Sequence, residues 1–306
     1  MIVTNKLGLP SPVVRAVTPK RDPHARRGGA DISVTELIGP PRIMQLRERY
    51  WDQITEDASD LLFALYGTIG HDILSRNAEA GKLTEQRLRI RVTHNGRPWV
   101  ISGQFDLVDD DDGVRVLTDY KFTSAWTFIF GKPEWEQQLN IYRLMLQETG
   151  NGTVQRLQNV LLFRDWQKRE AERNNEYPRG RAAVINQPMW SDERTMEFIH
   201  ERLEAHSHER PECTDEERMV KPESVAVMKQ GGKRAIGVFE VDPKNPQAAA
   251  AQAQSFILHE TAQNPELKLE AVVRRTDPIR CTNFCSVWKW CEFGRQVRGF
   301  EEDEPD

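Results

Sequence analysis

Residues 103–121 of this 306-residue chain read GQFDLVDDDDGVRVLTDYK. Apolar and polar residues alternate on both sides of an Asp-rich turn that ends at Gly113, which is the pattern of two half-buried strands joined by a tight connection. We therefore expect strands at residues 98–108 and 114–122, paired antiparallel as a hairpin.

Three charged residues of this hairpin lie close together in the expected pairing. Asp106 ends the first strand and Asp119 lies near the end of the second, so their carboxylates are expected to be cross-strand neighbours. Lys121 follows two residues after Asp119, and the period of two in a strand places both side chains on one face. Two carboxylates and an ammonium group are what Mg²⁺-dependent phosphodiester cleavage needs. Taken alone, such a triplet is more often a solvent-exposed ion pair.

The flanking sequence adds helices and strands to this hairpin. Residues 85–92 alternate apolar and basic residues before the turn Asn95-Gly96, which predicts an earlier strand and a three-stranded antiparallel meander. Residues 58–78 and 133–149 have helical spacing, and residues 155–164 have the apolar composition of a buried strand. The order helix, three strands, helix, strand predicts an α/β core of about 130 residues.

Composition divides the chain into four expected parts. These are a Pro- and Arg-rich flexible arm at residues 1–30, the α/β core at 31–165, an extension with three C-terminal cysteines at 166–296, and an acidic tail at 297–306. Within the extension we expect a helix at 194–206, a hairpin at 224–241 and an Ala-rich helix at 247–263.

Overall charge and hydropathy exclude some classes of protein. Forty-two Lys and Arg residues against 47 Asp and Glu residues give a net charge of −5, which argues against a wholly basic surface but not against a local basic groove. No apolar run approaches the roughly 18 residues of a membrane span, and the N-terminus lacks the apolar stretch of a secretory signal. We therefore expect a cytoplasmic protein without a membrane partner.

Four short motifs occur in order along the expected core. They are Gly70-His71, Gly103-Gln-Phe-Asp106, Asp119-Tyr-Lys121 and Gln138-x-x-x-Tyr142. This series resembles the PD-(D/E)XK nuclease superfamily, specifically its RecB-type exonuclease branch, which includes nucleases of CRISPR adaptation and phage recombination exonucleases. The resemblance covers about residues 33–165 and 207–295. It implies a restriction-endonuclease-like core with a central mixed sheet flanked by helices.

The resemblance implies a divalent-metal site in this core. His71, Asp106 and Asp119 would be ligands of Mg²⁺ or Mn²⁺, with the backbone carbonyl of Tyr120 as a further ligand. Imidazole beside carboxylates suits Mn²⁺ as well as Mg²⁺. A lone histidine on a helix is more often a packing residue, and this alternative stays open for His71.

The same resemblance implies roles for four other side chains. Lys121 would be the catalytic lysine. Gln138 and Tyr142, one helical turn apart and so on one face, would orient the active site or contact the DNA strand. Glu85, at the start of the strand expected at 85–92, matches an acidic position often seen in this branch.

Cys281, Cys285 and Cys291 form a compact cluster in a chain without an export signal, where a metal site is favoured over disulfides. Thiolates at this spacing hold zinc or an iron–sulfur cluster, which needs four ligands. In the branch that this chain resembles, three such cysteines join an earlier one to bind [4Fe–4S]. Pro40 stands where that cysteine is expected, which leaves Cys213 as the candidate fourth ligand. Zinc and unligated thiols remain alternatives.

Basic and aromatic side chains are candidates for DNA contact. The basic ones, on the first strand and after the core, are Arg87, Arg89, Arg91, Lys168, Arg169, Arg173, Arg179 and Arg181. The aromatic ones, which could pack or stack on bases, are Trp126, Phe128, Phe130 and Trp135. A solvated strand face is an equal alternative for the arginines. No reader of base edges is apparent, which suits sequence-independent binding.

These features together predict a metal-dependent deoxyribonuclease, an exonuclease that trims DNA ends in recombination, repair or replication in a bacterial or phage-infected cell. Its partners would be DNA and recombination or replication proteins. One alternative is a catalytically silent DNA-binding or assembly subunit, against which the intact Asp106, Asp119 and Lys121 argue. Another is a zinc-stabilised interaction protein, in which the Asp-Lys series would be coincidental.

Overall fold

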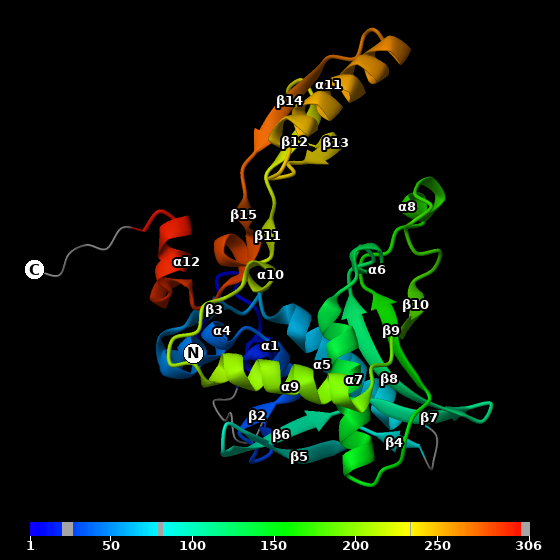
Figure 1. The fold of residues 1–306 in the computed structure, drawn as a ribbon, viewed down its shortest axis with the longest axis vertical. Helices are drawn as coiled ribbons and strands as arrows, with labels where there is room; N and C mark the ends of the chain where they lie inside the picture. The colour runs from blue at the N-terminus through cyan, green and yellow to red at the C-terminus, as the bar shows by residue number, and fades with distance from the viewer. Residues whose placement is uncertain (20–26, 79–81, 233, 301–306) are drawn as a thin grey trace, which may run out of the picture. The chain divides into compact units, whose positions relative to one another are not determined.

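The structure, a computed structural model, describes residues 1–19, 27–78, 82–232 and 234–300. The chain folds into two compact units, which are residues 1–212 and the residues from Cys213 onward. Figure 1 shows the helices and strands of both. The mixed α/β character that the sequence predicts is confirmed.

The central sheet of the first unit has five strands in the order β10-β9-β8-β7-β4. In chain order they are β4 (Leu83–Thr84), β7 (Leu107–Asp111), β8 (Val114–Thr123), β9 (Arg156–Phe163) and β10 (Ala182–Gln187). β8 and β9 run parallel, because the helix α7 (Pro133–Glu148) carries the chain back between them, whereas the other pairs are antiparallel. The register sets Asp119 of β8 opposite Asn159 of β9.

A separate three-stranded sheet has the order β2-β6-β5. Its strands are β2 (Ile32–Ser33), β5 (Arg87–His94) and β6 (Arg97–Gln104). The prediction of one continuous strand at 98–108, and with it the single meander, is therefore wrong. The chain leaves β6 and enters β7 of the central sheet across Phe105 and Asp106. Burial of the Phe105 ring and a hydrogen bond to the Asp106 carboxylate stabilise this change of sheet.

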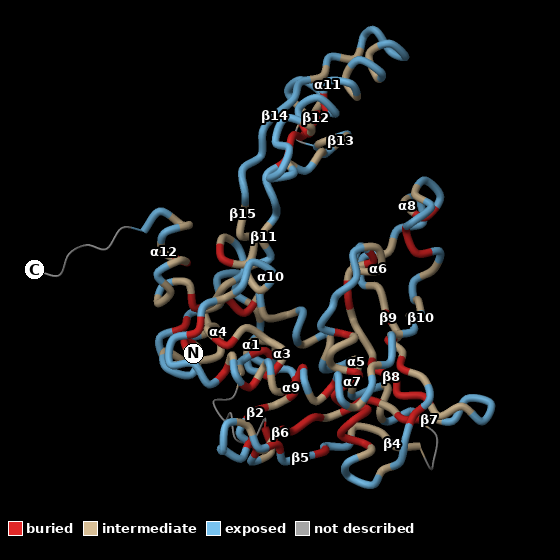
Figure 2. The backbone as a smooth tube through the Cα atoms, in the orientation of Figure 1, coloured by how far each residue is buried: buried red, intermediate tan, exposed pale blue. Residues whose placement is uncertain are grey.

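Several helices of the first unit contribute apolar side chains to a core that they share with the two sheets. They are α3 (Val34–Ile38), α4 (Pro41–Arg49), α7 and α9 (Asp192–Ser207). A further helix, α5 (Leu62–Arg76), has no fully buried residue. Residues 139–146 of α7 are all buried, and Figure 2 shows this buried backbone beside the strands. Phe198, Ile199 and Leu203 of α9 complete the same core. The first unit thus continues past residue 165, because α9 supplies apolar surface that the sheets need.

The N-terminal residues, for which the sequence predicts a flexible arm, include a strand and a short helix. β1 (Ile2–Thr4) pairs parallel with β3 (Thr55–Asp57). The carboxylate of Asp57 accepts hydrogen bonds from Thr4 Oγ1 at 2.8 Å and from the backbone N–H of Lys6 at 2.9 Å. Residues 20–26 of the expected arm lie outside the described residues.

Other helices in the described part of the first unit are short. They are α1 (Ser11–Val17), the 3₁₀ helix η1 (Trp51–Gln53), α6 (Thr127–Phe130) and α8 (Lys168–Arg173). Ala125, Ala171 and Tyr177 form a small buried cluster where the chain around α6 meets the chain around α8.

The second unit contains a module inserted between two short paired strands, β11 (Val220–Lys221) and β15 (Asp277–Pro278). The module consists of β12 (Ser224–Lys229), β13 (Ala235–Glu240), α11 (Pro246–Gln263) and β14 (Leu269–Arg274). Its strands form a sheet in the order β13-β12-β14, and α11 packs on it through Ala249 and Ala253. The predicted hairpin and Ala-rich helix are confirmed, since both are local patterns.

Short helices flank this module on either side in the sequence. They are α10 (Asp215–Arg218), the π helix η2 (Arg280–Phe284), the 3₁₀ helix η3 (Trp288–Trp290) and α12 (Glu292–Val297). Residues 301–306 of the expected acidic tail lie outside the described residues. No helix in the described part of the chain is long and apolar enough to cross a membrane.

Candidate active site

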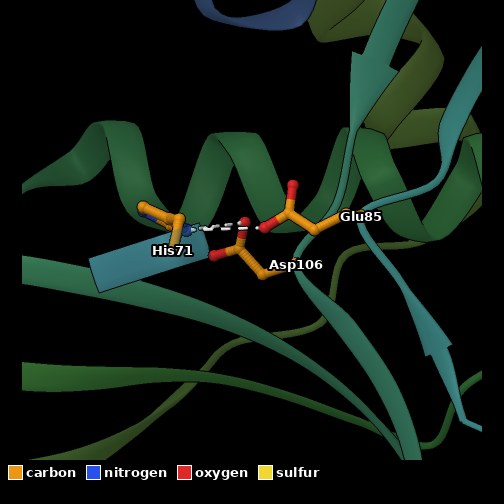
Figure 3. A group of neighbouring side chains, drawn as sticks. All are labelled: His71, Glu85 and Asp106. Atoms are coloured by element: carbon orange, nitrogen blue, oxygen red, sulfur yellow. Dashed lines mark ion pairs between the residues drawn. The ribbon is translucent and has the colours of Figure 1, made fainter. Parts of the chain in front are cut away.

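Three side chains converge in the first unit, as Figure 3 shows. His71 comes from α5, Glu85 from the connection between β4 and β5, and Asp106 from the step between β6 and β7. His71 Nδ1 lies 3.3 Å from Asp106 Oδ1 and 3.8 Å from Glu85 Oε1. One ligand atom from each residue lies within 4.8 Å of the others, so this group is a candidate metal site.

Gly70 explains how α5 can bring His71 to this position. A Cβ atom at Gly70 would lie 1.9 Å from the Phe122 ring, so only glycine lets the helix approach β8 this closely. The imidazole of His71 packs edge-on against Phe122, with ring centroids 5.7 Å apart, and against Tyr120 at 6.5 Å. The Gly70-His71 motif therefore has a steric basis in the fold.

Glu85 joins the group through an unusual backbone conformation. Its φ of 49° lies in the left-handed region, which non-glycine residues seldom adopt. Gln104 Nε2 donates a 2.6 Å hydrogen bond to Glu85 Oε2, and this bond orients the carboxylate toward His71. The acidic position that the sequence singled out thus lies beside two of the predicted ligands.

The charges of these three residues influence one another. The hydrogen bond to Asp106 raises the pKa of His71 above its ordinary value, and the nearby carboxylates of Glu85 and Asp119 raise it further. Burial raises the pKa of Glu85, and the charge of Asp106 acts in the same direction. The site therefore favours a positive charge, which a proton on His71 or a divalent cation can supply.

Asp119 is not part of this three-residue group, but it lies next to it in a second, more buried arrangement. Lys121 Nζ lies 2.8 Å from Asp119 Oδ2 and donates a 2.8 Å hydrogen bond to Gln138 Oε1. Gln138 Nε2 in turn donates to Tyr142 Oη at 2.9 Å. Burial raises the pKa of Asp119, and the charge of Asp106 raises it as well. The structure thus links four of the predicted site residues in one chain of contacts.

Tyr142 is the buried end of this series of contacts. Its ring occupies the space that Gly103 leaves, because a Cβ atom at Gly103 would lie 2.6 Å from the ring. Burial raises the pKa of the Tyr142 phenol well above its usual range, so the hydroxyl stays protonated. Tyr142 is therefore a fixed hydrogen-bond partner for Gln138.

Two residues near Asp119 were missed by the sequence reasoning. Asn159 Nδ2 donates a 2.9 Å hydrogen bond to Asp119 Oδ2, and Gln187 Nε2 donates at 2.8 Å to Asn159 Oδ1. Asn159 is fully buried on the face of β9 that also carries Leu157 and Leu161. An amide between leucines on the buried face of a strand is a signal that could have pointed to this role, since buried amides need partners.

The candidate DNA-contact residues differ in how accessible they are. Trp135 is buried in α7, so it packs in the core and offers no ring to a base. Trp126 is partly exposed and packs edge-on against Tyr177, whereas Phe130 is 79% exposed. On the arginine strand, Arg89 donates to the backbone carbonyl of Gly28.

The four cysteines all belong to the second unit, and none of them forms a disulfide. Burial, together with Glu217 and the three other cysteines, raises the pKa of the Cys213 thiol to about 12. Burial also raises the pKa of Cys281, and the charges of Cys285 and Cys291 raise it further. The charges of Cys281, Cys285 and Cys291 thus affect a thiol that is far from them in the sequence. No three of them, however, come within the 4.8 Å that joins the His71 group in the described structure.

Comparisons with known proteins show which family this chain belongs to. The solved structure titled "Crystal structure of SSO0001" is similar, with a TM-score of 0.44 and 16% sequence identity over 68% of this chain and 89% of that chain. No curated protein matches the sequence. The family model of the PD-(D/E)XK nuclease superfamily matches residues 42–292, which include His71, Asp106, Asp119 and Lys121. The chain therefore belongs to the PD-(D/E)XK nuclease superfamily.

Proposed function

We propose that this protein is a Mg²⁺- or Mn²⁺-dependent deoxyribonuclease, an exonuclease that processes DNA ends in recombination, repair or replication. The observation that carries the proposal is the position of the buried Asp119–Lys121 pair next to the His71, Glu85 and Asp106 group. Membership of a nuclease superfamily supports the same reaction class.

The donor set fits a hard or borderline divalent cation. It consists of one imidazole and two carboxylates, and Asp119 lies close enough to affect the pKa of His71. The side chains of His71 and Glu85 keep 34% and 28% of their surface exposed, so an ion can enter from solvent. His71, Glu85, Asp106 and Asp119, with the Tyr120 carbonyl, would hold the ion, which when bound activates water and offsets phosphate charge.

Lys121 and the residues that hold it supply the positive charge that the protein itself brings to the reaction. Lys121 Nζ is held between Asp119 and Gln138, so the ammonium group has a fixed position. There it can orient the attacking water or neutralise charge that develops on the phosphate. Tyr142 holds Gln138, which makes Gln138 and Tyr142 positioning residues.

We also propose that Cys213, Cys281, Cys285 and Cys291 bind a [4Fe–4S] cluster. Four free thiols in one compact unit are the donor set that such a cluster requires. The charges of the other three cysteines raise the pKa of the Cys213 thiol, which supports a common site.

The cluster would have a structural role. Cys213 precedes β11 and Cys281 follows β15, so the ligands enclose the inserted module in the sequence. A brown colour and broad visible absorbance of anaerobically purified protein would support the cluster. Colourless protein that contains zinc would contradict it.

The nuclease proposal is tested with end-labelled linear DNA and circular DNA, each with Mg²⁺ or Mn²⁺. We expect the wild-type protein to degrade linear DNA and Lys121→Ala to lose this activity. Lys244→Ala, which removes an exposed lysine from the second unit, is the matched control and should cut normally.

Each failure has a separate meaning. Cleavage that survives Lys121→Ala would refute the assigned site. Degradation of circular DNA would contradict an exonuclease. Binding of DNA without cleavage by the wild type would favour the catalytically silent subunit.

A further inference from the structure

The helix that supplies His71 also carries an exposed aromatic residue on the same row. Phe63, Gly67 and His71 are spaced by four residues, so they follow one another along one side of α5. Phe63 is 58% exposed. From Phe63 to His71 the helix rises about 12 Å, which equals three to four stacked nucleotides at roughly 3.4 Å each.

Gly67, in the middle of this row, has no packing explanation. A Cβ atom built on it would meet no atom of the described residues within 4 Å, unlike Gly70 one turn later, whose space the Phe122 ring fills. A glycine inside a helix destabilises it relative to alanine. The helix surface at Gly67 is therefore open, and a ligand can approach the backbone of α5 there.

A positive charge lies at the far end of the row. The guanidinium of Arg164 stacks over the Phe63 ring at 4.2 Å from its centroid. The Arg164 backbone N–H donates to the Thr123 carbonyl, which ends β8, the strand of Asp119 and Lys121. Tyr66 packs edge-on against Phe63 at 6.2 Å. Aromatic rings beside an exposed arginine are the contacts that unpaired bases and their phosphates make.

We propose that the row Phe63–Gly67–His71 is the path along which one unpaired DNA strand enters the candidate metal site. A base stacks at Phe63 and Arg164, and the backbone crosses α5 at Gly67, where a side chain would obstruct it. Bases inside a duplex have no free face for such stacking, so the substrate end is single-stranded. This proposal rests on the proposed function and specifies its substrate.

The test measures binding of a fluorescent single-stranded oligonucleotide and of a blunt duplex to the full chain, in Ca²⁺ to prevent cleavage. Phe63→Ala should weaken single-strand binding roughly 5- to 100-fold, as expected for loss of one stacking contact. Phe63→Trp should retain it, and Phe63→Leu, which is apolar without an aromatic face, should not. Gly67→Leu should weaken binding by blocking the path.

Two comparisons separate this effect from misfolding. Gly67→Ala should melt at the wild-type temperature or higher, because alanine favours the helix, yet it should bind the single strand more weakly. Ile73→Ala removes another exposed apolar side chain of α5, away from the row, and should bind as the wild type does.

The outcomes distinguish this proposal from the nuclease assignment. If Phe63→Ala and Gly67→Leu weaken single-strand binding but the wild-type protein never cuts DNA, the nuclease proposal is refuted and the path is supported. Normal single-strand binding by Phe63→Ala and Gly67→Leu, in a protein that cuts DNA, would overturn the path. The exposed Phe63 ring would then be a contact for a protein partner. Equal losses for the single strand and the blunt duplex would overturn the single-strand assignment.

Discussion

The backbone N–H of Tyr120 donates a 2.7 Å hydrogen bond to Asp106 Oδ2, at the point where the chain passes from one sheet to the other. This bond joins the residue before β7 to the strand that carries Asp119 and Lys121. Asp106 therefore has two tasks, since its other oxygen, Oδ1, lies 3.3 Å from His71 Nδ1.

Asparagine and alanine at position 106 separate these two tasks. Asp106→Asn keeps an acceptor for the Tyr120 N–H but removes the charge, so we expect near-normal stability and loss of cleavage. Asp106→Ala also leaves the partly buried Tyr120 N–H without this partner, which costs about 1 kcal/mol of unfolding free energy. Thermal melting and the linear-DNA assay check both. Equal melting temperatures for the two variants would contradict the structural task.

Gln138→Ala should slow cleavage without abolishing it. The change removes one of the two contacts that hold Lys121 Nζ, while the contact with Asp119 remains. Loss of a supporting partner typically lowers activity by roughly 10- to 100-fold. Gln147→Ala on the same helix, whose side chain contacts Asp192 instead, is the control and should cut normally. A Gln138→Ala enzyme with unchanged kcat would contradict the positioning role.

Asp57 should make the stability of the N-terminal strand depend on pH. Hydrogen bonds from the Lys6 N–H, from Ser59 and from Thr4 hold the pKa of its carboxyl far below the ordinary range. A lowered folded-state pKa adds stability above the unfolded value of about 3.9, and this stability is lost as the pH falls toward the folded value. The difference in urea midpoint between wild type and Asp57→Ala should therefore be larger at pH of about 7 than at about 3. A difference that stays constant would contradict this origin.

Cys213→Ser should abolish incorporation of the cluster. Cys213 is the one cysteine outside the C-terminal group, so without it only three thiols remain. Its pKa of about 12 without metal means that ligation must displace a proton, so reconstitution should be slower at lower pH. Iron content and visible absorbance measure both effects. Full iron content in Cys213→Ser would exclude this residue as a ligand.

Local patterns in the sequence were sufficient for much of the fold. The period of two in 85–92 and the helical spacing of 133–149 predicted β5 and α7 within two residues, because each pattern reflects burial of one face. The change of sheet at Asp106 could not be predicted in this way. Both halves of 98–108 have strand character, and only the pairing partners differ.

The residues of the candidate site also differ in whether they could be predicted from the sequence. Motif order placed Asp106, Asp119, Lys121, Gln138 and Tyr142 in one region. The structure links the last four by direct contacts and joins Asp106 to the backbone of Tyr120 beside them. Asn159 and Gln187 were missed because Asn159 reaches Asp119 only through the parallel pairing of β8 with β9, and Gln187 reaches Asn159 only through the pairing of β9 with β10.

The mixed α/β class, the main helices and strands, and a family-like order of polar residues could be predicted from the amino-acid order, since these depend on neighbours along the chain. Three relationships come from the folded chain instead. Glu85 lies with His71 and Asp106, Asp119 pairs with Lys121 beside this group, and the space at Gly67 is open while the Phe122 ring fills the space at Gly70. These relationships depend on how close α5 lies to the step between two sheets. That distance is set by long-range packing, which no local pattern records.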